Sequence, residues 1–134
     1  MRDFDVQSIE IAAPLEQAFR YVADPRTLPE WTHAFRSVSN GRATLATPKG
    51  SVEVGLDVRA SLEGGTIDWI MTFPDGSVGR AFSRLVPLEH ARTLYSFVLL
   101  APPVALEQVE GALAVQARVL RQELAALQER LARS

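Results

Sequence analysis

A chain of 134 residues with 47% apolar side chains falls within the range of a single domain with one hydrophobic core, and we expect residues 1–134 to form one domain. Its net charge of -2, its one lysine, Lys49, and its scattered arginines argue against a nucleic-acid-binding surface. The lack of cysteine excludes disulfides and thiolate chemistry, and the lack of a signal-peptide pattern or of an apolar run of about 18 residues predicts a cytoplasmic protein without an integral membrane segment.

The N-terminal part of the chain predicts one strand followed by two short helices. Residues 3–11 are extended in character and end at Ala12-Ala13-Pro14. Proline is tolerated in the first turn of a helix, and after Pro14 the apolar residues recur at helical spacing, as Leu15, Ala18, Phe19 and Val22. Asp24-Pro25 ends this helix and can open a second one, with Asp24 as its N-cap, that runs to about Trp31.

From Ala34 to Leu100 apolar and polar residues alternate, which is typical of strands. Turn signals such as Asn40-Gly41 divide this stretch into a meander of six strands. Residues 51–62 have one apolar and one polar face, and the next strand continues the inner face with Ile67, Trp69, Met71 and Phe73. Arg59 and Asp68 fall on the outer faces of these two strands, where we expect them to form an exposed cross-strand pair.

The last two strands, residues 77–87 and 92–100, are partly apolar on both faces. The inner face of the first carries small residues, Gly79, Ala81 and Ser83, which could leave room beneath a covering helix. The outward apolar residues of both strands predict a patch that would invite a second subunit and make a homodimer, formed by Phe82, Val86, Leu94, Val98 and Leu100.

The C-terminal stretch from Pro103 to Arg133 predicts one long amphipathic helix. Residues at spacings of three and four form a stripe that is apolar except at Glu110: Leu106, Glu110, Leu113, Ala117, Leu120, Leu124, Leu127 and Leu131. Glu123 is among the residues assigned to the solvent-facing side. Because one face is apolar, the helix must lie against another part of the protein.

This order of elements resembles the START-like superfamily (helix-grip, SRPBCC), and within it the polyketide cyclase/dehydrase-like branch. The segment IAAPLEQAFRYVADPRTLPEW is similar to the N-terminal stretch of that family, and FSRLVPLEHARTLYSF and the closing helix agree with it. The resemblance implies an α+β helix-grip fold, in which a curved antiparallel sheet of about seven strands wraps around the long C-terminal helix. It also implies a cavity between sheet and helix that binds an apolar or amphipathic small molecule, and it transfers no fixed catalytic set.

Several apolar residues are candidates for lining this cavity, although each is equally suited to an ordinary core. They are Trp31, Phe35, Trp69, Met71, Phe73, Phe97 and Leu113. Tyr95 and Ser83 lie on the inner faces of adjacent predicted strands, so their hydroxyls could contact a ligand carbonyl or bond to each other or to water.

Two ionisable residues are candidates for proton transfer. His33 follows Trp31 at the expected cavity mouth and could act as an acid or base, although a solvent-facing loop histidine is the preferred interpretation. Glu110 interrupts the apolar stripe and would be desolvated there, but a slight rotation of the helix places Val109 inward and Glu110 at the rim, which we favour. We therefore assign no catalytic residue, no metal site and no cofactor.

The sequence thus predicts a binding protein for a small hydrophobic or amphipathic ligand. One alternative is a polyketide cyclase- or dehydratase-like enzyme that uses Glu110, His33 or Tyr95. A second is a protein-interaction module that dimerises through the outer face of the last two strands.

Overall fold

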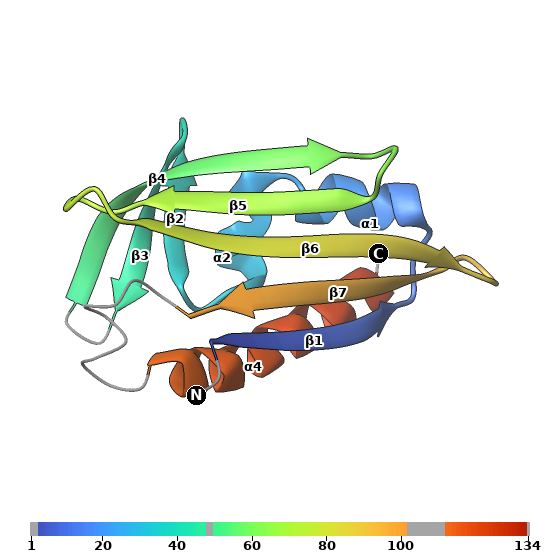
Figure 1. Ribbon diagram of the computed structural model, residues 1–134. Coiled ribbons are helices and arrows are strands. Elements are labelled where there is room, and N and C mark those ends of the chain that lie inside the picture. The colour runs from blue at the N-terminus through green and yellow to red at the C-terminus, as the bar shows by residue number, and fades with distance from the viewer. Residues whose placement is uncertain (1–2, 48–49, 102–111, 134) are drawn as a thin grey trace.

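The computed structural model describes residues 3–47, 50–101 and 112–133 (Figure 1). The beginning of the predicted C-terminal helix, with Val109 and Glu110, lies outside these residues. In chain order, the elements are β1 (Phe4–Ile11), α1 (Leu15–Val22), the 3-10 helix η1 (Pro25–Thr27), α2 (Leu28–Trp31), β2 (Phe35–Ser39), β3 (Arg42–Thr47), β4 (Gly50–Ser61), β5 (Thr66–Thr72), β6 (Val78–Leu88), β7 (Arg92–Leu100) and α4 (Ala112–Ala132).

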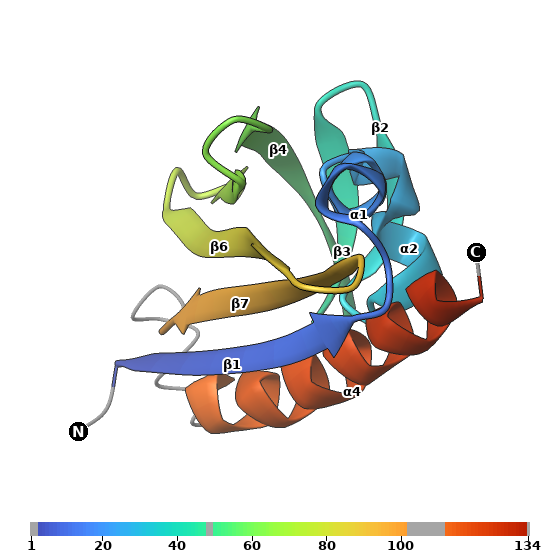
Figure 2. The same cartoon turned by 90° about the vertical axis from the view of Figure 1, so that its right-hand side faces the viewer.

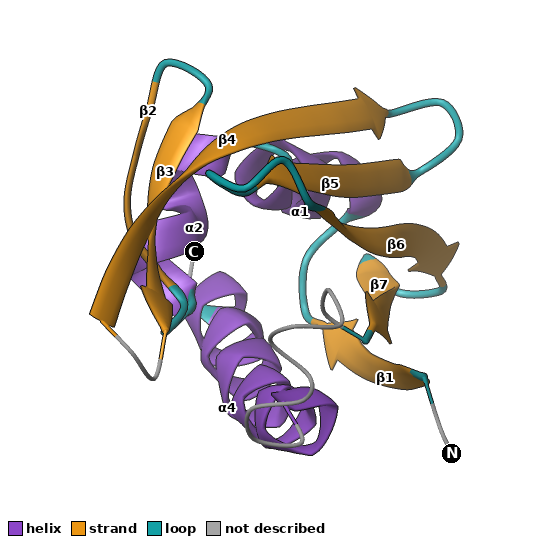
Figure 3. Cartoon of the chain, turned by 60° about the vertical axis from the view of Figure 1, so that its left-hand side comes forward, coloured by secondary structure: helices purple, strands orange, loops and turns teal. Residues whose placement is uncertain are grey.

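The strands form one antiparallel sheet of seven strands in the order β1-β7-β6-β5-β4-β3-β2. The sheet is a meander from β2 to β7, and β1 joins it beside β7 as a border strand. The sheet curves, and α4 runs along β1 (Figures 2 and 3). Helix α2 lies against β2 and α4, and α1 contacts β6 and β7. The predicted α+β helix-grip architecture is confirmed.

The two short helices begin as their sequence predicts. Pro14 precedes the first residue of α1, and the Asp24 carboxylate accepts a hydrogen bond of 3.0 Å from the Arg26 backbone N–H at the start of η1. The turn between β6 and β7 is less expected, because His90 and Ala91 have φ values of 63° and 56°. This left-handed conformation favours glycine or asparagine, which neither residue is.

Helix α4 is held against the sheet by its apolar stripe and by two side-chain amides. Leu120, Leu124, Leu127 and Leu131 are buried, as predicted. Gln7 of β1 donates to the carbonyl of Ala117 at 2.8 Å, and Gln128 of α4 donates to the carbonyl of Glu10 at 2.7 Å. Thus β1 donates one of these hydrogen bonds to α4, and α4 donates the other to the border strand β1.

The inner face of the sheet is packed unevenly along its strands. At one end its residues are fully shielded, among them Ile11, Ile67, Leu85, Thr93 and Tyr95. Toward the other end its residues are only half-buried, among them Asp5, Met71, Phe73, Gly79 and Leu99. The register aligns these positions, since Asp5 pairs with Leu99 and Met71 with Gly79. The inner face thus has a closed end and a partly open end.

The outer face carries the predicted apolar patch and extends it onto β1. Val98 of β7 lies between Val6 of β1 and Phe82 of β6, and Phe4 lies opposite Leu100. Phe4 and Val6 are 49% and 50% exposed. Farther along the sheet, Arg59 lies opposite Asp68 as expected, but the ion pair that its side chain makes is with Asp57, at 3.1 Å.

Candidate functional site

Three aromatic side chains form a cluster on the inner face of β5, β6 and β7. The rings of Trp69 and Phe97 are stacked with their centroids 5.5 Å apart, and Tyr95 meets Phe97 edge-on at 6.3 Å. Trp69 comes from β5 and Phe97 from β7, on either side of β6, where Ala81 lies opposite Trp69 and Ser83 opposite Phe97. The aromatic rings of the neighbouring strands therefore occupy the space beside the small side chains of β6. From the size of these small side chains alone we expected that space to be available to a ligand.

The aromatic residues near this surface leave buried polar atoms without partners. Among the described residues, no hydrogen-bond partner exists for Nε1 of Trp31, Nε1 of Trp69 or the hydroxyl of Tyr95, although all three atoms are shielded from water. An unsatisfied buried donor costs about 1–3 kcal/mol, so such atoms are rare in folded proteins. Each of these three atoms therefore lowers the stability of the folded protein.

Ser83 and Tyr95 behave differently although they lie side by side. The Ser83 hydroxyl donates to the carbonyl of Ile67 at 2.7 Å. Burial raises the pKa of Tyr95 well above its ordinary value, an effect that the nearby Ser83 hydroxyl offsets only in part. Because burial raises its pKa, Tyr95 stays protonated and is a poor base.

The other predicted lining residues fall into two groups. Trp31 of α2 and Leu113 of α4 are buried, at 3% and 8% exposed, and Trp31 belongs to the core cluster. Phe35, Met71 and Phe73 are half-buried and pack against the core from its accessible side. Val109 and Glu110 lie outside the described residues.

The side chain of His33 is exposed, but its backbone holds a buried carboxylate. Glu123 of α4 is 7% exposed and accepts hydrogen bonds from the backbone N–H groups of His33 at 2.6 Å and Ala34 at 3.2 Å. Desolvation raises the pKa of Glu123, and the two N–H donors and His33 offset this in part. Glu123 therefore joins the helix to the segment between α2 and β2.

The assignment of Glu123 to the solvent-facing side was wrong. It follows Leu120 by three residues and precedes Leu127 by four, so it lies in the apolar stripe itself. This spacing was the available signal, but the N–H groups that stabilise the carboxylate come from a distant part of the chain.

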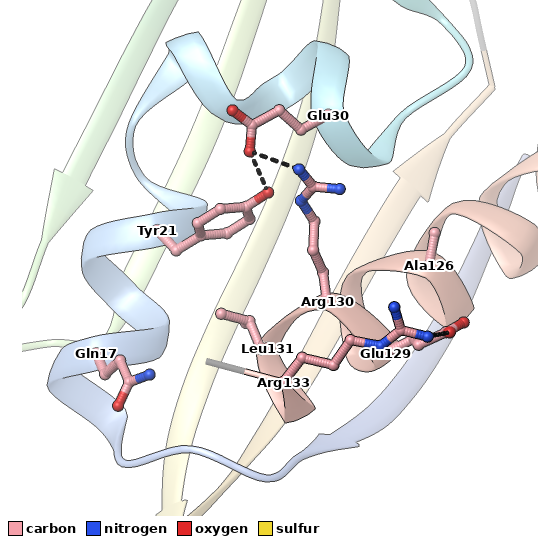
Figure 4. Close-up of a pocket in the computed structure, with 8 residues that line it drawn as sticks. All are labelled: Gln17, Tyr21, Glu30, Ala126, Glu129, Arg130, Leu131 and Arg133. Carbon is pink, nitrogen blue, oxygen red and sulfur yellow. Dashed lines mark hydrogen bonds and ion pairs between the residues drawn. The ribbon is translucent and has the colours of Figure 1, made fainter.

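A surface pocket of about 690 Å³ opens between α1, α2 and the end of α4 (Figure 4). Glu30 accepts a hydrogen bond of 2.7 Å from the Tyr21 hydroxyl and lies 3.4 Å from the Arg130 guanidinium. Burial raises the pKa of Tyr21 to about 12, and the adjacent Glu30 is the second cause of this rise. The sequence did not predict this pocket, which is lined by Gln17, Tyr21, Glu30, Ala126, Glu129, Arg130, Leu131 and Arg133.

Metal centres and membrane-spanning helices are two further classes of feature that bear on function. Within the described parts of the chain, no group of three or more His, Cys, Asp or Glu side chains is arranged to hold a metal ion. None of the helices described is both long and apolar enough to cross a membrane.

Comparison with known proteins identifies a family and a set of similar folds. Residues 6–132 match the sequence model of the family described as polyketide cyclase/dehydrase and lipid transport. No curated protein matches the chain.

Solved structures with similar folds include proteins of bacterial origin. The Zhui aromatase/cyclase from a Streptomyces species superposes with a TM-score of 0.74 at 16% identity, covering 97% of this chain and 93% of that one. A START superfamily protein from Mycobacterium smegmatis gives 0.72 at 15% identity, covering 98% and 99%. A conserved protein from Geobacillus kaustophilus gives 0.74 at 14% identity, covering 99% and 97%. At these identities the likeness concerns the fold.

Proposed function

Because the chain belongs to the polyketide cyclase/dehydrase and lipid transport family, we propose that it binds a small hydrophobic or amphipathic molecule between the inner face of the sheet and the C-terminal helix. The binding surface is the partly open end of the inner face, and the aromatic cluster forms its deep limit.

The uneven packing of the inner face carries this proposal. Met71, Phe73 and Leu99 are apolar and face the concave side of the sheet, yet they are only half-buried. Accessible apolar surface on a concave face is what a hydrophobic ligand requires, because the ligand removes that surface from water. Met71 adds an adaptable side chain that can adjust to the shape of a ligand.

A binding role is better supported than a catalytic one. Of the groups considered for proton transfer, Tyr95 is held protonated by burial and His33 is exposed to solvent, while Glu110 lies outside the described residues. We therefore propose ligand binding and assign no catalytic residue.

The proposal is tested with a neutral fluorescent probe of apolar surfaces, N-phenyl-1-naphthylamine, and a matched pair of variants. Leu99→Glu places a carboxylate on the inner face, whereas Val98→Glu places one on the outer face of the same strand at a similarly half-buried position. We expect the wild type and Val98→Glu to bind the probe and Leu99→Glu to lose at least tenfold in affinity. Equal affinity in the two variants, or no binding by the wild type, would contradict the proposal.

A further inference from the structure

The surface pocket beside Tyr21 lies apart from the binding surface proposed above. The described residues that line it come from α1, α2 and the end of α4, whereas the proposed surface is formed by the sheet (Figure 4). Helix α1 follows Ile11, which belongs to the closed end of the inner face, while the proposed surface lies at the partly open end. The pocket is therefore a second candidate site, which the proposed function does not use.

The wall of this pocket presents a carboxylate and a guanidinium side by side. Glu30 of α2 lies 3.4 Å from Arg130 of α4, and the Tyr21 hydroxyl donates to the same oxygen of Glu30, Oε1, at 2.7 Å. The hydroxyl orients the carboxylate, whose second oxygen can accept further hydrogen bonds. A guanidinium has several N–H donors, and within the described ranges Glu30 is the only ion-pair partner of Arg130. Both groups thus keep hydrogen-bonding capacity for a ligand.

The formal charges that line the pocket cancel. Besides Glu30 and Arg130, the lining contains Glu129 and Arg133, which form an ion pair one helical turn apart. An ion of single charge beside Glu30 and Arg130 is attracted by one of them and repelled by the other at nearly the same distance. A molecule that carries an ammonium and a carboxylate can place each group beside its opposite charge. The balanced lining therefore favours a zwitterion over a simple anion or cation.

The remainder of the lining includes apolar surface. The half-buried Tyr21 ring comes from α1, and Ala126 and Leu131 come from α4. Leu131 is buried and forms the floor, and in Figure 4 its side chain extends from α4 toward α1. A volume of about 690 Å³ is within the range of sites for small molecules. An apolar side chain of a ligand can thus lie beside the charged pair.

From this arrangement we propose that the pocket binds a small zwitterion of the α-amino-acid type with an apolar side chain. The ammonium of the ligand lies beside Glu30, its carboxylate lies beside Arg130, and its side chain contacts Tyr21 and Ala126. The Glu30 and Arg130 side chains are 45% and 49% exposed, so solvent screens both ion pairs and the affinity should be in the millimolar range.

Three probes that share a phenyl ring and a short chain test the proposal: L-phenylalanine, phenethylamine and 3-phenylpropionate. The first is a zwitterion at neutral pH, the second a cation and the third an anion. NMR chemical-shift titration of the full chain at low salt should give an affinity for L-phenylalanine at least fivefold higher than for either other probe. Equal or tighter binding of a singly charged probe, or no binding of L-phenylalanine, would overturn the proposal.

Charge-removing variants assign each end of the ligand. Glu30→Gln should weaken L-phenylalanine binding severalfold without weakening 3-phenylpropionate, and Arg130→Gln should weaken it without weakening phenethylamine. Arg42→Gln and Glu53→Gln are the matched controls, because they break an exposed ion pair of 3.2 Å between β3 and β4, and the affinity should not change. Unchanged L-phenylalanine affinity in Glu30→Gln and Arg130→Gln would contradict the assignment.

The Leu99→Glu variant separates this pocket from the inner face of the sheet. Its affinity for L-phenylalanine should equal that of the wild type, because Leu99 is not among the residues that line the pocket. A loss of L-phenylalanine binding in Leu99→Glu would place this probe on the inner face and overturn the proposal. Failure of N-phenyl-1-naphthylamine to bind would overturn the proposed function and leave this site standing.

Discussion

Glu123 is a carboxylate that connects α4 to the segment after α2, and its two hydrogen bonds define what a substitution there should do. Glu123→Ala leaves the N–H groups of His33 and Ala34 without their acceptor, and we expect the free energy of unfolding to fall by about 2–4 kcal/mol. Glu123→Gln keeps an acceptor oxygen and removes the buried charge. Its stability at neutral pH should equal or exceed that of the wild type, as urea unfolding can measure.

The raised pKa of Glu123 gives this comparison a pH dependence. The folded protein binds the proton more tightly than the unfolded chain, so the cost of burying the charge is fully present above the folded-state pKa. That cost disappears as the pH falls to the ordinary value of 4.5. Any advantage of Glu123→Gln should therefore shrink from pH 7 toward pH 4.5, and an advantage that grows on acidification would contradict the assigned direction.

Tyr95 differs from Glu123, because its buried hydroxyl has no hydrogen-bond partner among the described residues. Tyr95→Phe removes the unsatisfied group and keeps the ring that packs against Phe97, so we expect the unliganded protein to gain about 1 kcal/mol of stability. Ser83→Ala breaks a real hydrogen bond and should lose about 1 kcal/mol. Thermal and urea denaturation would check both, and a loss of stability in Tyr95→Phe would indicate a partner for the hydroxyl.

At the scale of single elements, the hairpin between β6 and β7 contains avoidable strain. His90 and Ala91 both have positive φ, a conformation that costs a residue with a β-carbon about 1 kcal/mol. Ala91→Gly should raise the free energy of unfolding by up to about 1 kcal/mol. Gly76→Ala is the matched reverse, because Gly76 has a φ of 89° and a β-carbon added there would meet no atom within 4 Å, so only the backbone conformation is tested. A stabilised Gly76→Ala would contradict this argument.

The elements themselves could largely be predicted from the sequence. The alternation in residues 51–62 and the spacing from Leu120 to Leu131 arise because one side of each element faces water. The faces that these patterns predict to be buried are the buried ones in the structure. What could not be predicted depends on atoms distant in the chain. Ala81 and Ser83 are small, but only the register shows that Trp69 and Phe97 meet above them.

The candidate site was predicted only in outline for the same reason. Tyr95 was placed correctly on the inner face, but its missing partner depends on how Ser83 bonds to Ile67. The pocket beside Tyr21 requires the end of α4 to reach α1 and α2, which a pattern along one segment does not encode. Glu110, for which we favoured a position at the rim, lies outside the described residues, and the buried carboxylate that the structure describes is Glu123.

For the whole molecule, the homodimer expected from the sequence stays a prediction. The outer patch contains Phe82 and Val98, extends to Phe4 and Val6 on β1, and would bury exposed apolar area in a face-to-face pair. Light scattering of the wild type should then give a concentration-dependent dimer that Phe82→Lys abolishes. Leu62→Lys, at an exposed apolar residue in the turn after β4, should not change it, and a monomer at all concentrations would contradict the expectation.

The amide of Gln128, bonded to the carbonyl of Glu10, has a consequence beyond attaching a helix. β1 is a border of an open sheet, and an uncovered border can recruit strands from other chains and start a fibril. Substitutions that loosen α4 would thus expose apolar surface and, at the same time, unpaired backbone groups of β1. We therefore expect variants with a loosened α4 to aggregate, which turbidity measurements would detect, before they lose ligand binding.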